Sequence, residues 1–321
     1  MKQYLVLDMG GSSIKYALMT EDGTFLDKGK CETELNDLDR LLELIGALGD
    51  QYAGRYAGVA VSMPGRIDTA NGMAYTGGAY LCIADAPMRS YLQECLQAPV
   101  TIANDAKCAA GAEAWSGALA DVADGVVLVL GSGIGGGVVL NHQVRMGHTF
   151  GSGELSFLSA DFRKTRPAGD SGSQFLQFSW TTYSSTTGLL REYALRKGMD
   201  PLMHGQNGQD FFAAWDQGEE EARGALQEFA ANTAAGIYAI QSVLDVERFA
   251  IGGGISARPE VTESIRKAVD ELWAAYPFLA FGKPEIVSCR YGNDANLIGA
   301  LAFHLKDTCA PGKNKAEAIN K

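Results

Sequence analysis

Short apolar runs that end at small or polar residues recur along this chain, and each run predicts a strand. The run at 56–62 is continuously apolar, which is typical of a parallel strand buried on both faces. Elsewhere apolar residues return every three or four positions, most clearly over 37–51, and this spacing predicts amphipathic helices. Strands are expected at 5–7, 14–19, 25–31, 56–62, 100–103, 126–130, 138–140, 248–251 and 285–289, and helices at 37–51, 88–97, 106–114, 189–194, 210–218, 219–229, 230–244, 265–276 and 297–303.

The first two strands flank a turn of small residues, with a carboxylate before it and a lysine after it. Gly10 and Gly11 permit backbone conformations closed to other residues and let a phosphate approach the N–H groups, while Ser12 adds a hydroxyl donor. Asp8 stands where the strand ends, a natural place to hold Mg²⁺ through water, and Lys15 follows the turn. The same pattern also suits an ordinary β-hairpin or a surface salt bridge. The sequence leaves both interpretations open.

A second glycine-rich turn follows the strand at 126–130. Five glycines occur in 131–137, beginning Gly131-Ser132-Gly133, and a further strand follows at 138–140. This repeats the order strand, glycine turn, strand, and an internal duplication of that kind predicts two similar domains with one phosphate loop each. A third cluster, Gly252-Gly253-Gly254, follows the strand at 248–251 and fits contact with a flat purine or ribose.

Two further loops stand at the carboxyl ends of predicted parallel strands, where open α/β sheets bind ligands. Pro64 and Gly65 follow the run at 56–62, and Asn104 and Asp105 follow the strand at 100–103. An Asp at the start of a helix is commonly a cap. Asp105 would, however, lie at the same sheet edge as Asp8 and Gly65, which favours a functional role.

Composition narrows the class of protein. At 321 residues the chain is long enough for two domains, and its formal net charge of −11 argues against a nucleic-acid partner. No apolar run approaches the ~20 residues of a membrane span, and the first strand leaves no room for a signal peptide. The six cysteines are scattered without a Cys-x-x-Cys pair, which predicts reduced thiols, no structural zinc and a cytoplasmic location.

The order of these motifs resembles that of the ROK (repressor, open reading frame, kinase) family of sugar kinases, from Leu5 to about Leu305. The resemblance implies an α/β protein with the two-domain actin-like ATPase (ribonuclease H-like) fold, whose cleft between the domains would hold ATP, Mg²⁺ and a sugar. The motifs are Asp8-x-Gly-Gly-x-x-x-Lys15, Pro64-Gly65, Asn104-Asp105, the turn at 131–137, Gly153-Glu154, the cluster at 252–254 and Gly292-Asn-Asp-Ala295.

The resemblance also implies domain bounds and residue roles. One domain would span 1–118, completed by the helix at 293–305, the other 119–292, and a disordered tail 306–321. Asp105 would be the catalytic base, and Gly65, Asn104, Asp105 and Glu154 would bind the sugar. Asp8 would orient Mg²⁺ through water, and the ATP-binding residues would be Asp8, Gly10, Gly11, Ser12, Lys15, Gly131, Ser132, Gly133, Gly252, Gly253 and Gly254.

Two departures from the family pattern bear on the substrate. Phe157 stands where zinc-containing members carry a His, and the cysteine-rich segment is absent; Thr181 stands near the place of a second sugar-binding Glu. The chain thus resembles the zinc-free branch, which includes β-glucoside kinases. Phe157, Trp180 and Tyr183 are candidates for an aromatic wall over a second sugar ring, or they pack in the core.

The expected reaction is therefore ATP-dependent phosphorylation of the 6-hydroxyl of a hexose or β-glucoside. The expected partner is a small-molecule sugar, with no nucleic acid or membrane, and a homodimer is left open. Family repressors carry an N-terminal helix-turn-helix, which is not expected here because the first strand begins at once. Two alternatives from other classes are a non-catalytic sugar-sensing protein and an ATPase that uses the nucleotide only to change conformation.

Overall fold

The computed structural model describes residues 1–164, 177–202 and 205–309. By their internal contacts these residues form two compact units. The first unit contains residues 1–112 and the segment from Asp294 onward, and the second contains the described residues of 113–293. The chain therefore passes from the first unit into the second after Ala112, and returns after Asn293.

The first unit is built on a five-stranded sheet with the order β3-β2-β1-β4-β7. Its first three strands are antiparallel neighbours, whereas β1, β4 and β7 run parallel. As the buried run at 56–62 predicts, β4 is buried along its whole length, although it begins at Val59. The strands are β1 (Gln3–Met9), β2 (Ile14–Thr20), β3 (Phe25–Cys31), β4 (Val59–Met63) and β7 (Val100–Asn104), with a small separate pair, β5 (Ile67–Asp68) and β6 (Met73–Ala74).

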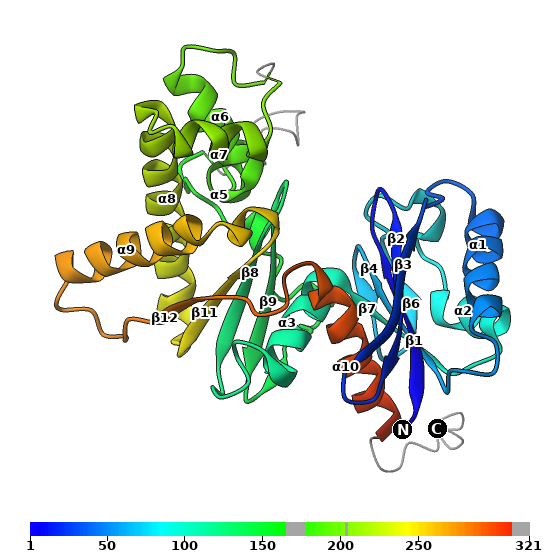
Figure 1. Ribbon diagram of the computed structural model, residues 1–321. Helices are drawn as coiled ribbons and strands as arrows, with labels where there is room; N and C mark the ends of the chain where they lie inside the picture. The colour runs from blue at the N-terminus through cyan, green and yellow to red at the C-terminus, as the bar shows by residue number, and fades with distance from the viewer. Residues whose placement is uncertain (165–176, 203–204, 310–321) are drawn as a thin grey trace. The chain divides into compact units, whose positions relative to one another are not determined.

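Helices cover both faces of this sheet. Figure 1 shows α1 (Leu38–Gln51) and α2 (Met88–Leu96) on one face and α10 (Ala295–Cys309) on the other. Asp37 caps α1 by accepting a hydrogen bond from the backbone N–H of Arg40. α3 (Asp105–Ser116) starts directly after β7, so the strand end and the helix start form one continuous segment. A short 3₁₀ turn, η1 (Leu81–Ile83), precedes α2.

The last helix is longer than the sequence predicts. α10 continues to Cys309, so residues 306–309 are helical and do not belong to a disordered tail. Asp307 accounts for this extension, because it accepts a hydrogen bond from Thr101 Oγ1 and pairs with Arg89, both in the first unit. Residues 310–321 of the predicted tail lie outside the described residues.

The second unit repeats the architecture of the first. Its sheet has the order β10-β9-β8-β11-β12. As in the first unit, the first strand pairs antiparallel with the second and parallel with a strand that returns after helices. This common topology confirms the internal duplication expected from the two glycine-rich turns. The strands are β8 (Gly125–Leu130), β9 (Ile134–Leu140), β10 (Gln143–Val144), β11 (Arg248–Gly252) and β12 (Glu285–Ser288).

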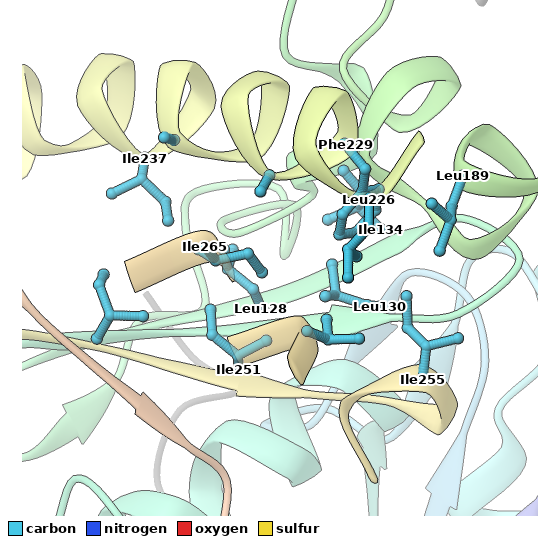
Figure 2. Close-up of a cluster of buried hydrophobic side chains, with 14 of the residues drawn as sticks. Leu128, Leu130, Ile134, Leu189, Leu226, Phe229, Ile237, Ile251, Ile255 and Ile265 are labelled. Atoms are coloured by element: carbon cyan, nitrogen blue, oxygen red, sulfur yellow. The ribbon is translucent and has the colours of Figure 1, made fainter. Parts of the chain in front are cut away.

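Helices α8 and α9 pack on this sheet, and the short helices before α8 pack against α8. Figure 2 shows the apolar core, to which the sheet contributes Leu128 and Ile251 and α8 contributes Phe229. The helices are α5 (Thr181–Ser184), α6 (Thr186–Arg196), α7 (Gly208–Asp216), α8 (Glu220–Leu244) and α9 (Pro259–Ala275), with 3₁₀ turns η2 (Leu155–Phe157), η3 (Gly254–Ala257) and η4 (Gly292–Asp294).

Several predicted boundaries in this unit are wrong, and the helix expected at 265–276 begins already at Pro259. The helices expected at 219–229 and 230–244 are one helix, α8, because its buried residues recur at helical spacing through 237 and 241. Gly236 lies in its middle, where a Cβ atom would come within 2.0 Å of the Trp180 ring. The glycine turn is also shorter than 131–137. Gly135, Gly136 and Gly137 belong to β9, where they pair with Val129, Leu128 and Val127.

Candidate active site

Asp8 is the centre of a buried polar group at the end of β1. Its carboxylate is 3% exposed, and Oδ1 accepts hydrogen bonds from Ser62 Oγ at 3.1 Å and from Asn296 Nδ2 at 3.0 Å. Lys15 Nζ lies 3.4 Å from Oδ2, because the β1–β2 register places the two residues opposite each other. A carboxylate fixed in this way has a defined orientation, which suits binding a hydrated Mg²⁺ ion.

In the turn after Asp8, limited space for a side chain, rather than unusual backbone angles, explains the glycines. Neither Gly10 nor Gly11 has a positive φ, so the expectation of backbone conformations closed to other residues is wrong for both. A Cβ on Gly10 would lie 2.9 Å from the carbonyl oxygen of Ser13, which also accepts a hydrogen bond from the Gly10 N–H. Ser12 and Gly11 are exposed at the tip of the turn.

Asn104 and Asp105 join the end of β7 to the start of α3. Asn104 is buried, and its Oδ1 accepts a hydrogen bond from the backbone N–H of Lys107, three residues on, which is the geometry of a helix N-cap. Asp105 is the first residue of the helix, and its Oδ1 accepts from the N–H of Ala106 and from Asn104 Nδ2, each within 2.9 Å. The residue that caps α3 is therefore Asn104, and not Asp105, to which position alone assigned the cap. Two hydrogen bonds fix the Asp105 carboxylate.

Gly65 lies beside this pair. The Asn104 Nδ2 group also donates a hydrogen bond to the Gly65 carbonyl oxygen at 2.9 Å. Gly65 has a φ of +97°, and a Cβ there would lie 2.0 Å from the Thr76 carbonyl oxygen, so only glycine fits. In the first unit the structure thus brings together the predicted sugar-binding residues Gly65, Asn104 and Asp105 through direct hydrogen bonds.

Sequence reasoning missed Ser62 and Asn296, the two hydrogen-bond donors to Asp8 Oδ1. They lie 54 and 288 residues from Asp8 along the chain. Ser62 comes directly before the predicted loop at the end of β4, and Asn296 follows the motif that ends at Ala295. Polar residues next to these two motifs were the signal that could have identified them.

In the second unit the corresponding turn comprises only residues 131–133. The Gly131 N–H donates to the Gly133 carbonyl oxygen at 3.0 Å, and the Gly131 carbonyl accepts from the Thr186 N–H at 2.9 Å. Thr181 Oγ1 accepts from the Ile134 N–H at 3.0 Å and lies against Gly133. Thr181, which stands near the place of a second sugar-binding Glu, thus supports the turn. Ser132 is exposed at its tip.

The three glycines in β9 position Glu154. Gly153 has a φ of +82°, and a Cβ there would lie 2.9 Å from the Gly136 carbonyl oxygen. A Cβ on Gly136 would in turn lie 2.7 Å from the Gly153 carbonyl oxygen. The absence of side chains lets the loop lie directly on the strand. Glu154 is exposed on this loop, immediately before η2, and belongs to the second unit.

The third glycine cluster lies at the end of β11. Gly253 has a φ of +93°, and a Cβ on it would lie 2.4 Å from the Leu130 carbonyl oxygen, so this position holds the β8 and β11 ends together. Gly252 is buried, and a Cβ there would lie 2.9 Å from Cys289 Sγ. Gly254 has open space where a Cβ would be.

That open space belongs to a pocket of about 670 Å³ between α7 and η3. Phe212 and Ile255 give it apolar walls, and the Arg258 guanidinium lies over the Phe212 ring, 4.8 Å from its centroid. Arg258 Nη1 donates to Asp216 Oδ2 at 3.0 Å, and these hydrogen bonds hold the pKa of the Asp216 carboxyl below its usual value. A flat, partly apolar ring system suits such a pocket.

The three candidate aromatic residues have different environments. Trp180 is 3% exposed in the core, and its Nε1 donates to the Asn232 carbonyl oxygen, so of the two alternatives left open for it the structure supports the core. Phe157 is 54% exposed and Tyr183 is 37% exposed. Only these two remain available to a ligand.

Two structural features are absent from residues 1–164, 177–202 and 205–309. In this part of the chain no group of three or more His, Cys, Asp or Glu side chains is arranged to hold a metal ion. Among the same residues no helix is both long and apolar enough to cross a bilayer. The five cysteines whose side chains are described form no disulfide.

The repeated sheets and their glycine turns define a two-domain α/β protein of the actin-like ATPase class. The chain belongs to the ROK family, whose sequence profile matches residues 4–307. It is 31% identical over 297 residues to a β-glucoside kinase of Klebsiella pneumoniae, with 92% of this chain and 93% of the relative covered. A β-glucoside kinase of Listeria monocytogenes serovar 1/2a is 28% identical, covering 94% and 96%.

A solved structure shows the same fold. The chain aligns with a ROK family protein from Streptococcus pneumoniae TIGR4, solved in complex with sucrose, with a TM-score of 0.82 and 27% identity over 95% of this chain and 99% of the other. These comparisons confirm the family and fold predicted from the order of motifs. The protein is an enzyme of the carbohydrate kinase class.

Proposed function

We propose that this kinase transfers the γ-phosphoryl group of ATP to the 6-hydroxyl of a β-glucoside, with Asp105 as the general base. The observation that carries the proposal is the hydrogen-bonded group Gly65, Asn104 and Asp105 at the end of β7. It holds a carboxylate at the position that matches the base of the family. The base would accept the hydroxyl proton while O6 attacks the γ-phosphorus, and the bond from phosphorus to the ADP oxygen would break.

Positioning and charge neutralisation dominate phosphoryl transfer, because the protein has little covalent chemistry to perform. Asn104 suits a positioning role, since its side chain already orients Asp105 and fixes the loop at Gly65. Glu154, on the loop supported by β9, would bind another sugar hydroxyl from the second unit. The proposal therefore requires the two units to bring these groups together when both substrates are bound.

The nucleotide would bind mainly to the second unit. The turn at 131–133 would offer backbone N–H groups to phosphate oxygens, and the pocket beside Gly254 and Ile255 has room for the base and ribose. In the first unit, Asp8 fits a water-mediated Mg²⁺ site, because its carboxylate is oriented by Ser62 and Asn296. Mg²⁺ bound with ATP would neutralise charge on the phosphates.

The substrate class rests on the relatives and on two aromatic residues. The curated relatives described above are named β-glucoside kinases. Phe157 and Tyr183 are exposed, so an aromatic face is available for a second ring, while Phe157 and Thr181 stand at positions that offer hydroxyl partners in other members. An apolar wall loses little when a hydroxyl of glucose is blocked, whereas a hydrogen-bonding site loses much.

A panel of hexoses and hexosides, assayed for sugar-dependent ADP release, tests the proposal. We expect kcat/KM for cellobiose or gentiobiose to equal or exceed that for glucose. A preference for glucose of tenfold or more would contradict the β-glucoside assignment and leave a glucokinase. ADP release that no sugar stimulates would indicate an ATPase that only changes conformation, and sugar binding without ADP release would indicate a sensor.

A further inference from the structure

Glu113 is a fully buried carboxylate at the point where the chain enters the second unit. Its side chain is 0% exposed, and it is the first residue after Ala112, the last residue of the first unit on this pass. The motifs that define the candidate active site do not include it. A buried charge is retained only where donors satisfy it, so its partners indicate its role.

Those partners are backbone N–H groups of both segments that connect the two units. Glu113 Oε2 accepts from the Ala118 N–H at 2.7 Å, on the outgoing connection. Glu113 Oε1 accepts from the N–H groups of Arg290 at 2.9 Å and Tyr291 at 3.2 Å, on the returning connection. A charged acceptor makes each of these hydrogen bonds stronger than a neutral pair would be. One side chain thus joins the two connections.

Other contacts reinforce the same junction. The Ser116 carbonyl oxygen accepts from Arg290 Nη1 at 2.9 Å and from Tyr291 Oη at 2.8 Å. Gly117 is required beside it, because a Cβ there would lie 2.3 Å from Glu113 Oε2. The last turn of α3 is therefore fastened to residues 290 and 291 at several points, all within the second unit.

The returning connection is also attached to the nucleotide side of the proposed site. The Cys289 N–H donates to the Ile251 carbonyl oxygen at 2.8 Å, and its sulfur packs against Gly252, the first glycine of the third cluster. Burial, together with the charge of Glu113, raises the pKa of the Cys289 thiol. Glu113 therefore contacts a segment that is directly joined to the end of β11.

The same two segments lead to the catalytic groups of the first unit. α3 begins with Asp105 and carries Glu113 two turns further on, so one continuous helix joins the two carboxylates. The returning connection continues into α10, where Asn296 donates to Asp8. Each connection thus runs from the Glu113 junction to one of the two carboxylates, Asp105 and Asp8.

We infer that Glu113 is a positioning residue that couples sugar binding to nucleotide binding by fixing both connections between the units. This inference rests on the proposed function. With the junction intact, binding of sugar beside Asp105 favours the arrangement that binds ATP well. With the junction loosened, each substrate still binds mainly to one unit, but neither improves the binding of the other, and the γ-phosphoryl group meets O6 less often.

The test compares Glu113→Gln with Gln241→Leu in the full-length protein. A glutamine in place of Glu113 presents an N–H₂ group toward backbone N–H donors and cannot satisfy all of them. Gln241 is a matched control, because its buried side chain also bonds loop backbone in the second unit, at Val246 and Gly282, away from the connections. Both variants are expected to lower the melting temperature.

Calorimetry with a non-hydrolysable ATP analogue, with and without saturating cellobiose, separates the two variants. Wild type and Gln241→Leu should bind the analogue at least about 5-fold more tightly when cellobiose is present, the lower end of usual coupling. Glu113→Gln should show less than about a 2-fold difference, with single-ligand affinities nearly unchanged and kcat about 10-fold lower. Wild-type coupling in a folded Glu113→Gln protein, or none in active wild type, would overturn the inference.

If Glu113→Gln does not fold, Glu113→Asp serves instead, because it keeps the charge and withdraws the carboxylate by one methylene group. It should also lose coupling, and full coupling in this variant would contradict the inference. The proposed function and the role of Glu113 can be refuted independently of each other. A wild-type protein that phosphorylates no sugar refutes the proposed function, whereas an active wild type with Glu113→Gln equal to Gln241→Leu refutes only the role of Glu113.

Discussion

The two glycine hairpins of this protein have the same backbone design and different chemistry. In the first unit the Gly10 N–H donates to the carbonyl oxygens of Asp8 and Ser13, and in the second the Gly131 N–H donates to those of Val129 and Gly133. Four residues separate β1 from β2, and three separate β8 from β9. The hydrogen bonds thus place Val129 where the first unit has Asp8.

This difference indicates a division of labour between the duplicated units. The first hairpin carries a buried carboxylate, and Ser62, Asn296 and Lys15 surround it. The negative charge of this carboxylate suits the proposed metal ion. The second hairpin has no ionisable group at the matching position, and hydroxyl groups of Ser156 and Thr181 support it. A turn of neutral donors suits phosphate, which a neighbouring carboxylate would repel. The following changes test this comparison.

The largest expected effect is that of Asp105→Asn in the first unit. Asparagine retains the size and the hydrogen bond from the Ala106 N–H but cannot accept the hydroxyl proton. We expect kcat to fall by about 10²–10⁴, the usual contribution of a general base, with unchanged folding. Rapid-quench measurement of single-turnover phosphoryl transfer provides the check. A rate within a few-fold of wild type would reduce Asp105 to a structural residue of α3.

Asp8→Asn is expected to have the next largest effect. It removes the charge while Oδ1 can still accept from Ser62 and Asn296, so kcat should fall by roughly 10–100-fold and the Mg²⁺ concentration for half-maximal activity should rise. Val129→Thr, at the matching position of the second unit, is the control and should change neither quantity. Equal effects of the two substitutions in a magnesium titration would abolish the proposed division.

Gly133→Val should act on the nucleotide alone. A Cβ at this position would lie 3.2 Å from Thr181 Oγ1, so the larger side chain displaces the turn and covers its N–H groups. We expect the affinity for an ATP analogue to fall about tenfold, comparable to the loss of one hydrogen bond. Gly131→Ala is the control, because its Cβ would meet only the Gly133 carbonyl oxygen at 3.6 Å. Unchanged affinity in a folded Gly133→Val protein would remove this turn from the site.

The smallest effect concerns stability rather than catalysis, and it is expected for a histidine of the first unit but not for the exposed histidines of the second. Burial lowers the pKa of His304 to about 4 in the folded first unit, and its Nδ1 lies 3.0 Å from Thr101 Oγ1. Because the unfolded chain takes up this proton at higher pH, His304 contributes stability above about pH 6.5 that is lost as the pH falls toward 4. The loss amounts to at most about 3 kcal/mol.

Urea unfolding at pH 7 and pH 4.5 measures this loss. His304→Gln should show a smaller decrease in unfolding free energy than wild type over this interval. His142 and His148 of the second unit are exposed, so glutamine at either position is a control that should leave the decrease unchanged. A wild-type decrease in His304→Gln would assign the acid sensitivity to other groups.

Much of the fold was accessible from the sequence because it depends on local patterns. The helix at 37–51 follows from apolar spacing, and the structure places it at Leu38–Gln51. Gly135 to Gly137 were misplaced because glycine usually marks turns. In β9 the same residues serve close packing of the loop at Gly153, which no local pattern reveals.

The candidate site was accessible where its residues form recognisable loops at strand ends, as at Gly65 and at Asn104 and Asp105. Asn104 and Asp105 stand side by side, whereas Ser62 and Asn296 reach Asp8 from distant segments. Trp180 shows another limit of prediction from the sequence. Its sequence position left a substrate wall and the core both open, and the space left by Gly236 in α8 takes the indole ring into the core.

The structure of the reaction product tests the central claim most directly. Cellobiose, ATP and Mg²⁺ are incubated with the enzyme, and the product is examined by two-dimensional phosphorus–proton NMR while ADP is quantified. The account predicts one phosphate on the C6 oxygen of the non-reducing glucose, and one ADP for each phosphorylated sugar. Phosphate at another position, or ADP formed without phosphorylated sugar, would contradict it.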